Sequence, residues 1–337
     1  MERRNRRLWL TILLGITILA GGCTLFGWPS AEATRQRVDD ATEHLDIIRR
    51  LDVAPEHGDE VDQAGTLLDQ ARNHLEAGRR SRAVEAAEES LAISQEILKA
   101  FYLDNIARMA RTLRDELTTR TTEDPEHPLK AELPRVEGII DRADRIAGDP
   151  QVVSLRQVLD DLEGILQISY AIQTTLTETL ESDISFAKGR YRLSDQGEKS
   201  IDRFLDTVRQ DRTASQERFP NGSIVTHVKV VGYTDSLNFG RGTRLERELT
   251  EGVGDQLPPA DPERRKFLNH RLSSFRAQTI ADFIRERLTA GDDGSRMAVK
   301  TETVGRGEAI PANVPAPYPV MDARRRICRI YVHTTIE

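Results

Sequence analysis

The chain has 337 residues, enough for two domains or for one domain with an extended part. Its residues are 31% charged, 38% hydrophobic and only 5% aromatic, which favours exposed helices over one large core. The formal net charge of −7 argues against the strongly basic surface that nucleic acid requires, so no nucleic-acid partner is expected.

The first 22 residues have the parts of a secretion signal. Arginines at 3, 4, 6 and 7 precede the apolar run "LWLTILLGITILA" at 8–20, which is too short to span a bilayer as a mature helix. Small residues then lead to Cys23. The segment resembles the signal peptide of bacterial lipoproteins, in which this cysteine becomes the first residue and carries the lipid. An ordinary signal peptide or a short anchor helix is the alternative.

The lipoprotein resemblance implies a mature protein held in the outer membrane and facing the periplasm. Residues 1–22 would be removed, Cys23 would carry palmitate and other acyl chains, and residues 23–33 would form a tether. Thr24, which is not an aspartate, resembles the sorting signal for the outer membrane. Two or more acyl chains anchor a protein stably, because each buried CH₂ contributes about 0.8 kcal/mol. With Cys23 lipidated, Cys328 has no disulfide partner and is expected to be a small buried hydrophobe.

Apolar residues at helical spacing predict an all-α domain over residues 34–181. A third apolar stripe begins at Ser81, a plausible N-cap, and predicts a helix that would be about 60 Å long if it ran unbroken to Arg120. The segment "TTEDPEHP" at 121–128 then interrupts the pattern with two prolines. The apolar stripes are narrow and the opposite faces are charged, which is typical of a helical bundle or coiled coil that packs on itself or on a protein partner. The predicted stripes are Val38–Ile48, Ala64–Leu75, Val84–Leu117, Val136–Ile146 and Val152–Leu180.

The pattern changes at residue 182, where strands begin to alternate with helices. The order strand, helix, strand, helix, strand, strand predicts an α+β sandwich, with helices on one face of a small sheet. The predicted segments are the strand "DISF" at 183–186, the helix at 193–210, the strand at 223–233, the helix at 269–288 and the strands at 297–305 and 325–333.

Four stretches within 182–337 occur in the order of a known family. They are "SDISFAKGRYRLSDQGEKSID" at 182–202, "VVGYTDS" at 230–236, "NHRLSSFRAQTI" at 269–280, and "GRGEAIP" at 305–311 followed by "ARRRICRI" at 323–330. Together they resemble the OmpA-like peptidoglycan-binding domain, with Tyr233 in place of the usual histidine and Arg324 in place of the usual asparagine. The resemblance implies the same βαβαββ fold and a peptidoglycan partner.

The resemblance also implies which side chains bind the stem peptide of peptidoglycan. Its diaminopimelate has an ammonium and a carboxylate on one carbon, so a receptor needs an anion and a cation on rigid elements. Asp235 would accept from the ammonium, and the planar guanidinium of Arg276 would hold the carboxylate through two bonds. Asn269 and Thr234 would add contacts, while Arg325 would contact the ligand or support the fold around the acid.

An insertion at 241–266 separates the acid from the helix arginine. Its charged residues, its glycines and its prolines predict a surface loop with one helical turn beside the site. Such a loop would cover the site, contact glycan or block the site.

The expected function is therefore a non-covalent link between outer membrane and cell wall, without catalysis, cofactor or metal. The seven histidines are dispersed, and the chain has no catalytic or phosphate-binding motif. The alternative is a periplasmic scaffold whose helical domain at 34–181 recruits protein partners, with an OmpA-like fold that does not bind the wall.

Overall fold

The computed structural model describes residues 29–51, 53, 57–148, 154–186, 190–290, 297–312 and 322–336. The predicted signal peptide, Cys23 and residues 24–28 of the tether lie outside these ranges. Contacts divide the chain into two compact units, residues 1–101 with 152–155 and residues 102–151 with 156–337. In the described ranges, the helices are too short or too polar to cross a bilayer.

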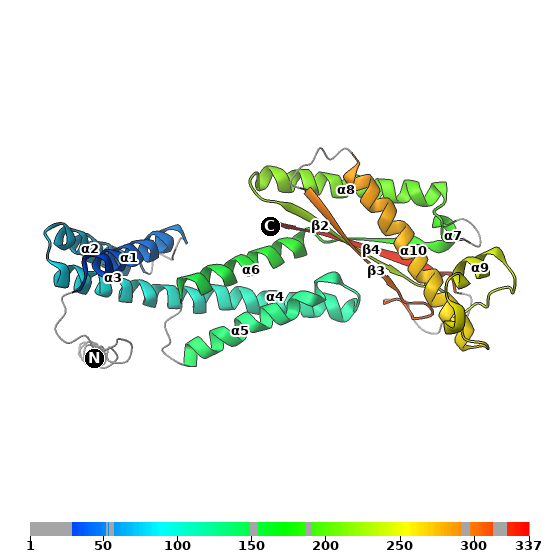
Figure 1. Ribbon diagram of the computed structural model, residues 1–337, viewed down its shortest axis with the longest axis horizontal. Coiled ribbons are helices and arrows are strands. Elements are labelled where there is room, and N and C mark those ends of the chain that lie inside the picture. Colours follow the sequence, from blue (N-terminus) through cyan, green and yellow to red (C-terminus); the bar gives the residue numbers. More distant parts are fainter. Residues whose placement is uncertain are drawn as a thin grey trace, which may run out of the picture. The chain divides into compact units, whose positions relative to one another are not determined.

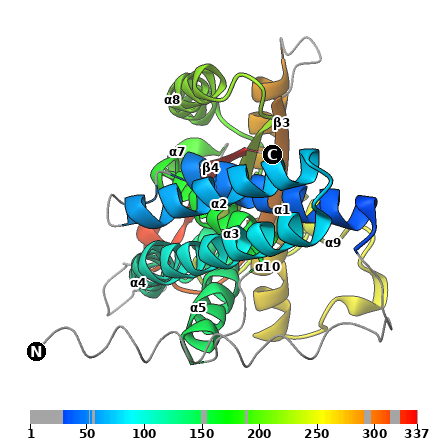
Figure 2. The same cartoon turned by 90° about the vertical axis from the view of Figure 1, so that its left-hand side faces the viewer.

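The first unit is built from three helices that pack side by side (Figure 1, Figure 2). Its helices are α1 (Ala31–Arg50), α2 (Gly58–Glu76) and α3 (Arg80–Phe101). Small residues let these helices approach closely, and the Ser90 hydroxyl donates to the Ala64 carbonyl at 2.8 Å. The predicted apolar stripes of α1 and α2 form the core, which contains Val38, Ala41, Leu45, Ala64, Leu68, Ala71, Ala86 and Ala87.

The helical part of the second unit begins with a π-helical turn at Tyr102–Ile106, so the long helix predicted from Ser81 to Arg120 is not a regular α-helix throughout. Buried Asp161 accepts from the Tyr102 hydroxyl at 2.6 Å and from Arg142 Nη2 at 2.5 Å. The other helical elements are α4 (Ala107–Glu123), a 3₁₀ turn (Pro128–Glu132), α5 (Leu133–Gly148) and α6 (Leu155–Gln173).

The rest of the second unit is a four-stranded sheet with two long helices on one face (Figure 1). Strand order is β1-β4-β2-β3, in which only β2 and β3 are parallel among the described pairs. The chain order confirms the predicted α+β class and the predicted βαβαββ arrangement. Its elements are β1 (Leu176–Glu181), α8 (Asp195–Arg218), β2 (Ile224–Gly232), α10 (Glu263–Thr289), β3 (Met297–Gly305) and β4 (Ile327–Ile336).

Two predicted elements at the start of the sheet are wrong. The helix predicted to reach Leu180 ends at Gln173, and the strand predicted at 183–186 is largely a helical turn, α7 (Ser182–Ser185). The first strand lies just before that turn, where "LTETLE" pairs with β4 and the exposure of its residues alternates along the strand. Residues 176–181, which we had assigned to the helical domain, therefore form an edge of the sheet.

The two faces of the sheet differ because side chains alternate along each strand. Val228 and Val230 of β2 pack in the core with α8 and α10, as does Cys328 of β4. Cys328 is a free buried thiol, as predicted, and burial raises its pKa to about 12. Lys229 and Tyr331 alternate with these core residues and therefore project from the opposite face.

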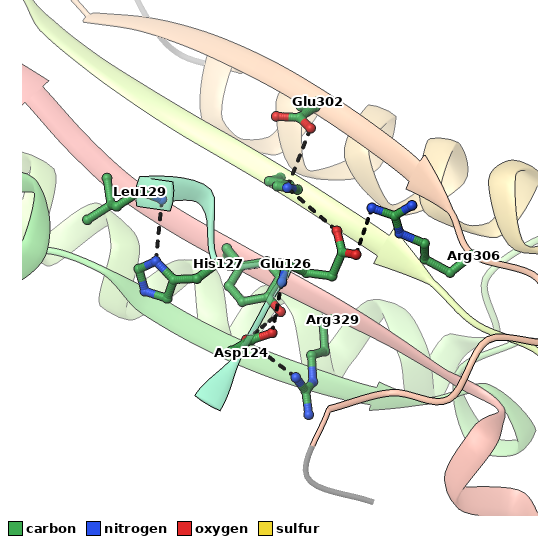
Figure 3. Close-up of polar contacts among 9 residues, drawn as sticks. Asp124, Glu126, His127, Leu129, Glu302, Arg306 and Arg329 are labelled. Carbon is green, nitrogen blue, oxygen red and sulfur yellow. Dashed lines mark hydrogen bonds and ion pairs between the residues drawn. The ribbon is translucent and has the colours of Figure 1, made fainter. Parts of the chain in front are cut away.

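That opposite face is covered by the turn between α4 and α5, residues 124–132, here called the acidic turn (Figure 3). Asp124 Oδ2 accepts from the Tyr331 hydroxyl at 2.7 Å and lies 3.3 Å from Arg329 Nη1. Glu126 lies 2.7 Å from Arg306 Nη2 and 3.8 Å from the Lys229 ammonium. The acidic turn, which the sequence indicated only as a break between helices, thus joins α4 and α5 to β2, to β4 and to the end of β3.

We expect Glu126→Gln to loosen the acidic turn, because it removes the counter-charge of Arg306 and one of the two carboxylates that pair with Lys229, the other being Glu302 at 3.6 Å. The local cost should be about 1–2 kcal/mol, which would speed amide hydrogen exchange in the turn by roughly 5- to 30-fold. Glu132→Gln is the matched control, since among the described residues Glu132 pairs only with Arg135, at 3.9 Å, and both side chains are substantially exposed. Equal exchange rates in the two variants would show that the contacts of Glu126 do not hold the turn.

Candidate functional site

Helix α10 lies directly against the ends of β2 and β3, where glycine is required on steric grounds. A Cβ at Gly232 would lie 2.3 Å from the Ser273 carbonyl oxygen, and one at Gly305 would lie 2.1 Å from the Ser274 hydroxyl. The Ser273 hydroxyl accepts from the Gly307 N–H at 2.9 Å, which ties the loop after β3 to the same helix. The loops that follow both strands are therefore fixed beside the first half of α10.

Asp235 lies in the loop after β2 and is only 5% exposed. Its Oδ1 accepts from the Leu237 N–H at 3.3 Å, whereas its Oδ2 accepts no hydrogen bond in the described part of the chain. Arg326 Nη1 lies 3.6 Å from this oxygen, which is an ion pair beyond hydrogen-bond length. The neighbouring Thr234 hydroxyl is also buried, and it has no hydrogen-bond partner among the described residues. Each unsatisfied buried group costs about 1–3 kcal/mol, so the site gains from a ligand that donates to it.

Burial raises the pKa of Asp235, although the Leu237 N–H and the charges of Arg326, Arg325 and Arg276 act in the opposite direction. Because the folded-state pKa lies above the unfolded value, the favourable contribution of this group is present at low pH and is lost as pH rises through the folded pKa. At neutral pH the ionised Asp235 therefore lowers the stability of the ligand-free fold.

Asn269 on α10 is held by the loop after β3. Its amide nitrogen donates to Glu308 Oε1 at 2.9 Å and to the Leu237 carbonyl at 3.4 Å. Burial tends to raise the pKa of Glu308, but Arg265 at 2.8 Å and Asn269 outweigh it and keep that pKa below its usual value. Arg325 Nη2 donates to the Glu308 carbonyl at 2.7 Å, so this arginine contacts the loop after β3.

Arg276 is half-buried on α10, with its guanidinium carbon 5.0 Å from the centre of the Phe186 ring. This is a cation–π distance, so the aromatic residue in the first family motif helps to position the arginine. The charge of Arg276 acts on the Asp235 carboxylate and lowers its pKa.

A pocket of about 480 Å³ opens beside Asp235. Asp235 and Asn269 line it, while Thr234, Arg276 and Arg325 lie outside its lining. The other lining residues are Arg190, Leu237, Asn238, Phe239, Gly240, Thr243, Arg244, Leu245 and Leu272.

The roles that we predict for the five residues remain predictions, and the structure supplies their positions. It also adds Arg326 and Glu308, which the sequence analysis did not name as site residues. Both lie in the last of the four stretches quoted above, where Glu308 follows Gly307 and Arg326 follows Arg325, and this position could have indicated them.

The insertion at 241–266 is more ordered than the surface loop that we predicted. It forms α9 (Arg244–Thr250) and a 3₁₀ turn (Gly254–Gln256), and α10 begins at Glu263, ahead of the predicted start at residue 269. Leu249 is fully buried against Leu268 and Leu272 of α10. The insertion therefore has an apolar anchor, and its first residues form one wall of the pocket.

Comparison with known proteins adds little to this description. No family model matches the chain, and no curated protein matches its sequence. One solved structure with some similarity is a putative MotB-like protein from Desulfovibrio vulgaris, with 19% sequence identity and a TM-score of 0.26. The similarity covers 48% of this chain and 76% of that chain. A TM-score this low carries no argument about function.

We expect Gly305→Ala to destabilise the second unit by about 1–3 kcal/mol, because the new methyl group overlaps the backbone and side chain of α10. Gly138→Ala is the control: its Cβ would meet only Arg142 Nη1, at 3.6 Å, and alanine favours a helix. Calorimetric unfolding of both variants tests the contact. An unfolding temperature for Gly305→Ala equal to that of wild type would contradict the close approach.

Proposed function

We propose that this chain binds peptidoglycan non-covalently through the diaminopimelate of the stem peptide, as an outer-membrane lipoprotein that links membrane to wall. The proposal combines the motif resemblance with one structural observation, the buried carboxylate of Asp235 with its unsatisfied Oδ2. It assigns no catalysis, cofactor or metal to the chain.

An ammonium group is the ligand that best fits this carboxylate. It donates up to three hydrogen bonds, so it can bond the Asp235 carboxylate, which lines the pocket, and still reach a second acceptor there. Each charge-assisted bond contributes about 1.5–3 kcal/mol where water is partly excluded. Binding would also remove the destabilisation that the ionised Asp235 causes in the free protein.

The second half of the zwitterion requires a cation close to the same acid. Arg276 fits this role because the Phe186 ring positions its guanidinium and its planar group can hold a carboxylate through two bonds. In this proposal Arg326 balances Asp235 in the free protein, and Asn269 and Arg325 hold the loops around the ligand.

Lipid attachment at Cys23 would place this site within reach of the wall. The wall polymer repeats its stem peptide, and tethering raises the effective concentration of the site. A modest affinity per site is therefore enough for stable attachment.

The pKa of Asp235 sets the expected pH dependence. The ammonium binds the ionised carboxylate, so wall binding should weaken as pH falls toward the raised pKa of the free site. That weakening should begin at a higher pH than an ordinary aspartate, with a pKa of about 3.9, would give.

Co-sedimentation with purified sacculi tests the proposal. Asp235→Asn keeps the shape of the side chain but removes its charge. Arg276→Lys keeps the charge but removes the planar guanidinium that can hold a carboxylate through two bonds. We expect Asp235→Asn to lower the affinity at least about tenfold and Arg276→Lys to lower it by a smaller factor.

Asp206→Asn is the matched control, because Asp206 is an exposed acid of α8 that pairs only with Arg209 among the described residues. Sedimentation of Asp235→Asn at the wild-type level would overturn wall binding by this site. That outcome would favour the alternative, a periplasmic scaffold that recruits protein partners through helices in 34–181.

A further inference from the structure

The pocket beside Asp235 extends past the acid along an apolar wall. Leu237, Phe239 and Leu245 come from the loop and the insertion, and Leu272 comes from α10. At about 480 Å³ the pocket is larger than one ammonium group requires and lies within the size range of small-molecule sites. A ligand bound at Asp235 can therefore continue as an aliphatic chain along this wall.

The insertion holds this wall in a fixed position. The Thr243 hydroxyl accepts from the Glu246 N–H at 3.2 Å and caps α9. The Glu246 carboxylate is buried and lies 2.7 Å from Arg264 Nη2, at the start of α10. Leu249 packs in the apolar cluster with Leu268. The residues that face the pocket are thus supported by an ion pair, a helix cap and a small core.

Two arginines line the same pocket as Asp235. Arg190 is exposed and has no ion-pair partner within the part of the chain that the structure describes. Arg244 is 61% exposed at its side chain and uses its Nε to bond Glu248 at 2.7 Å. Asp235 is the single acid among the described lining residues, so the pocket is negative at the loop after β2 and positive where these arginines lie.

We propose that Arg190 and Arg244 bind a second carboxylate of the same ligand, apart from the carboxylate of the diaminopimelate zwitterion. In a stem peptide this group is the free carboxylate of the residue next to diaminopimelate. The inference rests on the proposed function and extends it. It makes the insertion a specificity element that selects stem peptides in which this carboxylate is free over those in which it is an amide.

The test uses two soluble disaccharide-tripeptides prepared from peptidoglycan, one with the free carboxylate and one with the carboxamide at that position. Titration calorimetry with the full chain gives a Kd for each. We expect the wild type to favour the free acid, and the double variant Arg190→Ala/Arg244→Ala to lose about five- to tenfold in affinity for it. Affinity of the double variant for the amide form should stay within about twofold of wild type.

Arg247→Ala is the matched control, because Arg247 is an exposed arginine of the same helix that does not line this pocket. It should bind both ligands as the wild type does. Equal affinity of the wild type for acid and amide, or an equal loss of both in the double variant, would overturn the inference.

Asp235→Asn separates this result from the parent proposal. If Asp235→Asn loses affinity for both ligands, the site at Asp235 is supported, whatever the result for Arg190 and Arg244. Unchanged binding of both ligands by Asp235→Asn would overturn the proposed function, and the second-carboxylate site with it.

Discussion

The candidate site depends on the close contact between α10 and the ends of β2 and β3. Gly232 and Gly305 allow the helix backbone to touch both strands, because a side chain at either position would overlap Ser273 or Ser274. The Gly307 N–H bonds the Ser273 hydroxyl, and the Thr234 N–H bonds the Gly307 carbonyl at 2.8 Å. Ser273 of α10 thus holds the loop after β3, and that loop holds the loop after β2, which carries Asp235.

The electrostatics of the buried Asp235 oppose the stability of the fold at neutral pH. The carboxylate is buried, one of its oxygens has no hydrogen bond, and its pKa is raised. The three arginines that act on it, Arg326, Arg325 and Arg276, offset only part of the cost of burial. Acids with perturbed pKa values cluster at functional sites, so this arrangement is typical of one.

The sequence was sufficient for the sheet elements from α8 onward, since the period of the apolar residues changes at each of them, and the motifs brought Asp235 and Asn269 to one pocket. It was insufficient where partners lie far apart in the chain. Strand β1 depends on pairing with β4, and the acidic turn depends on Arg329 and Arg306. The wall formed by the insertion depends on Leu249 reaching α10, for which no local pattern exists.

The central claim is that Asp235 meets the ammonium of a wall peptide, and carboxyl-carbon NMR measures this most directly. The Asp235 signal can be assigned by its absence in Asp235→Asn and then followed through a pH titration, with and without a saturating soluble disaccharide-tripeptide. The account predicts a pKa above the ordinary value of about 3.9 in the free protein and a clearly lower pKa in the complex. A pKa that does not change when the peptide binds, or that rises, would contradict it.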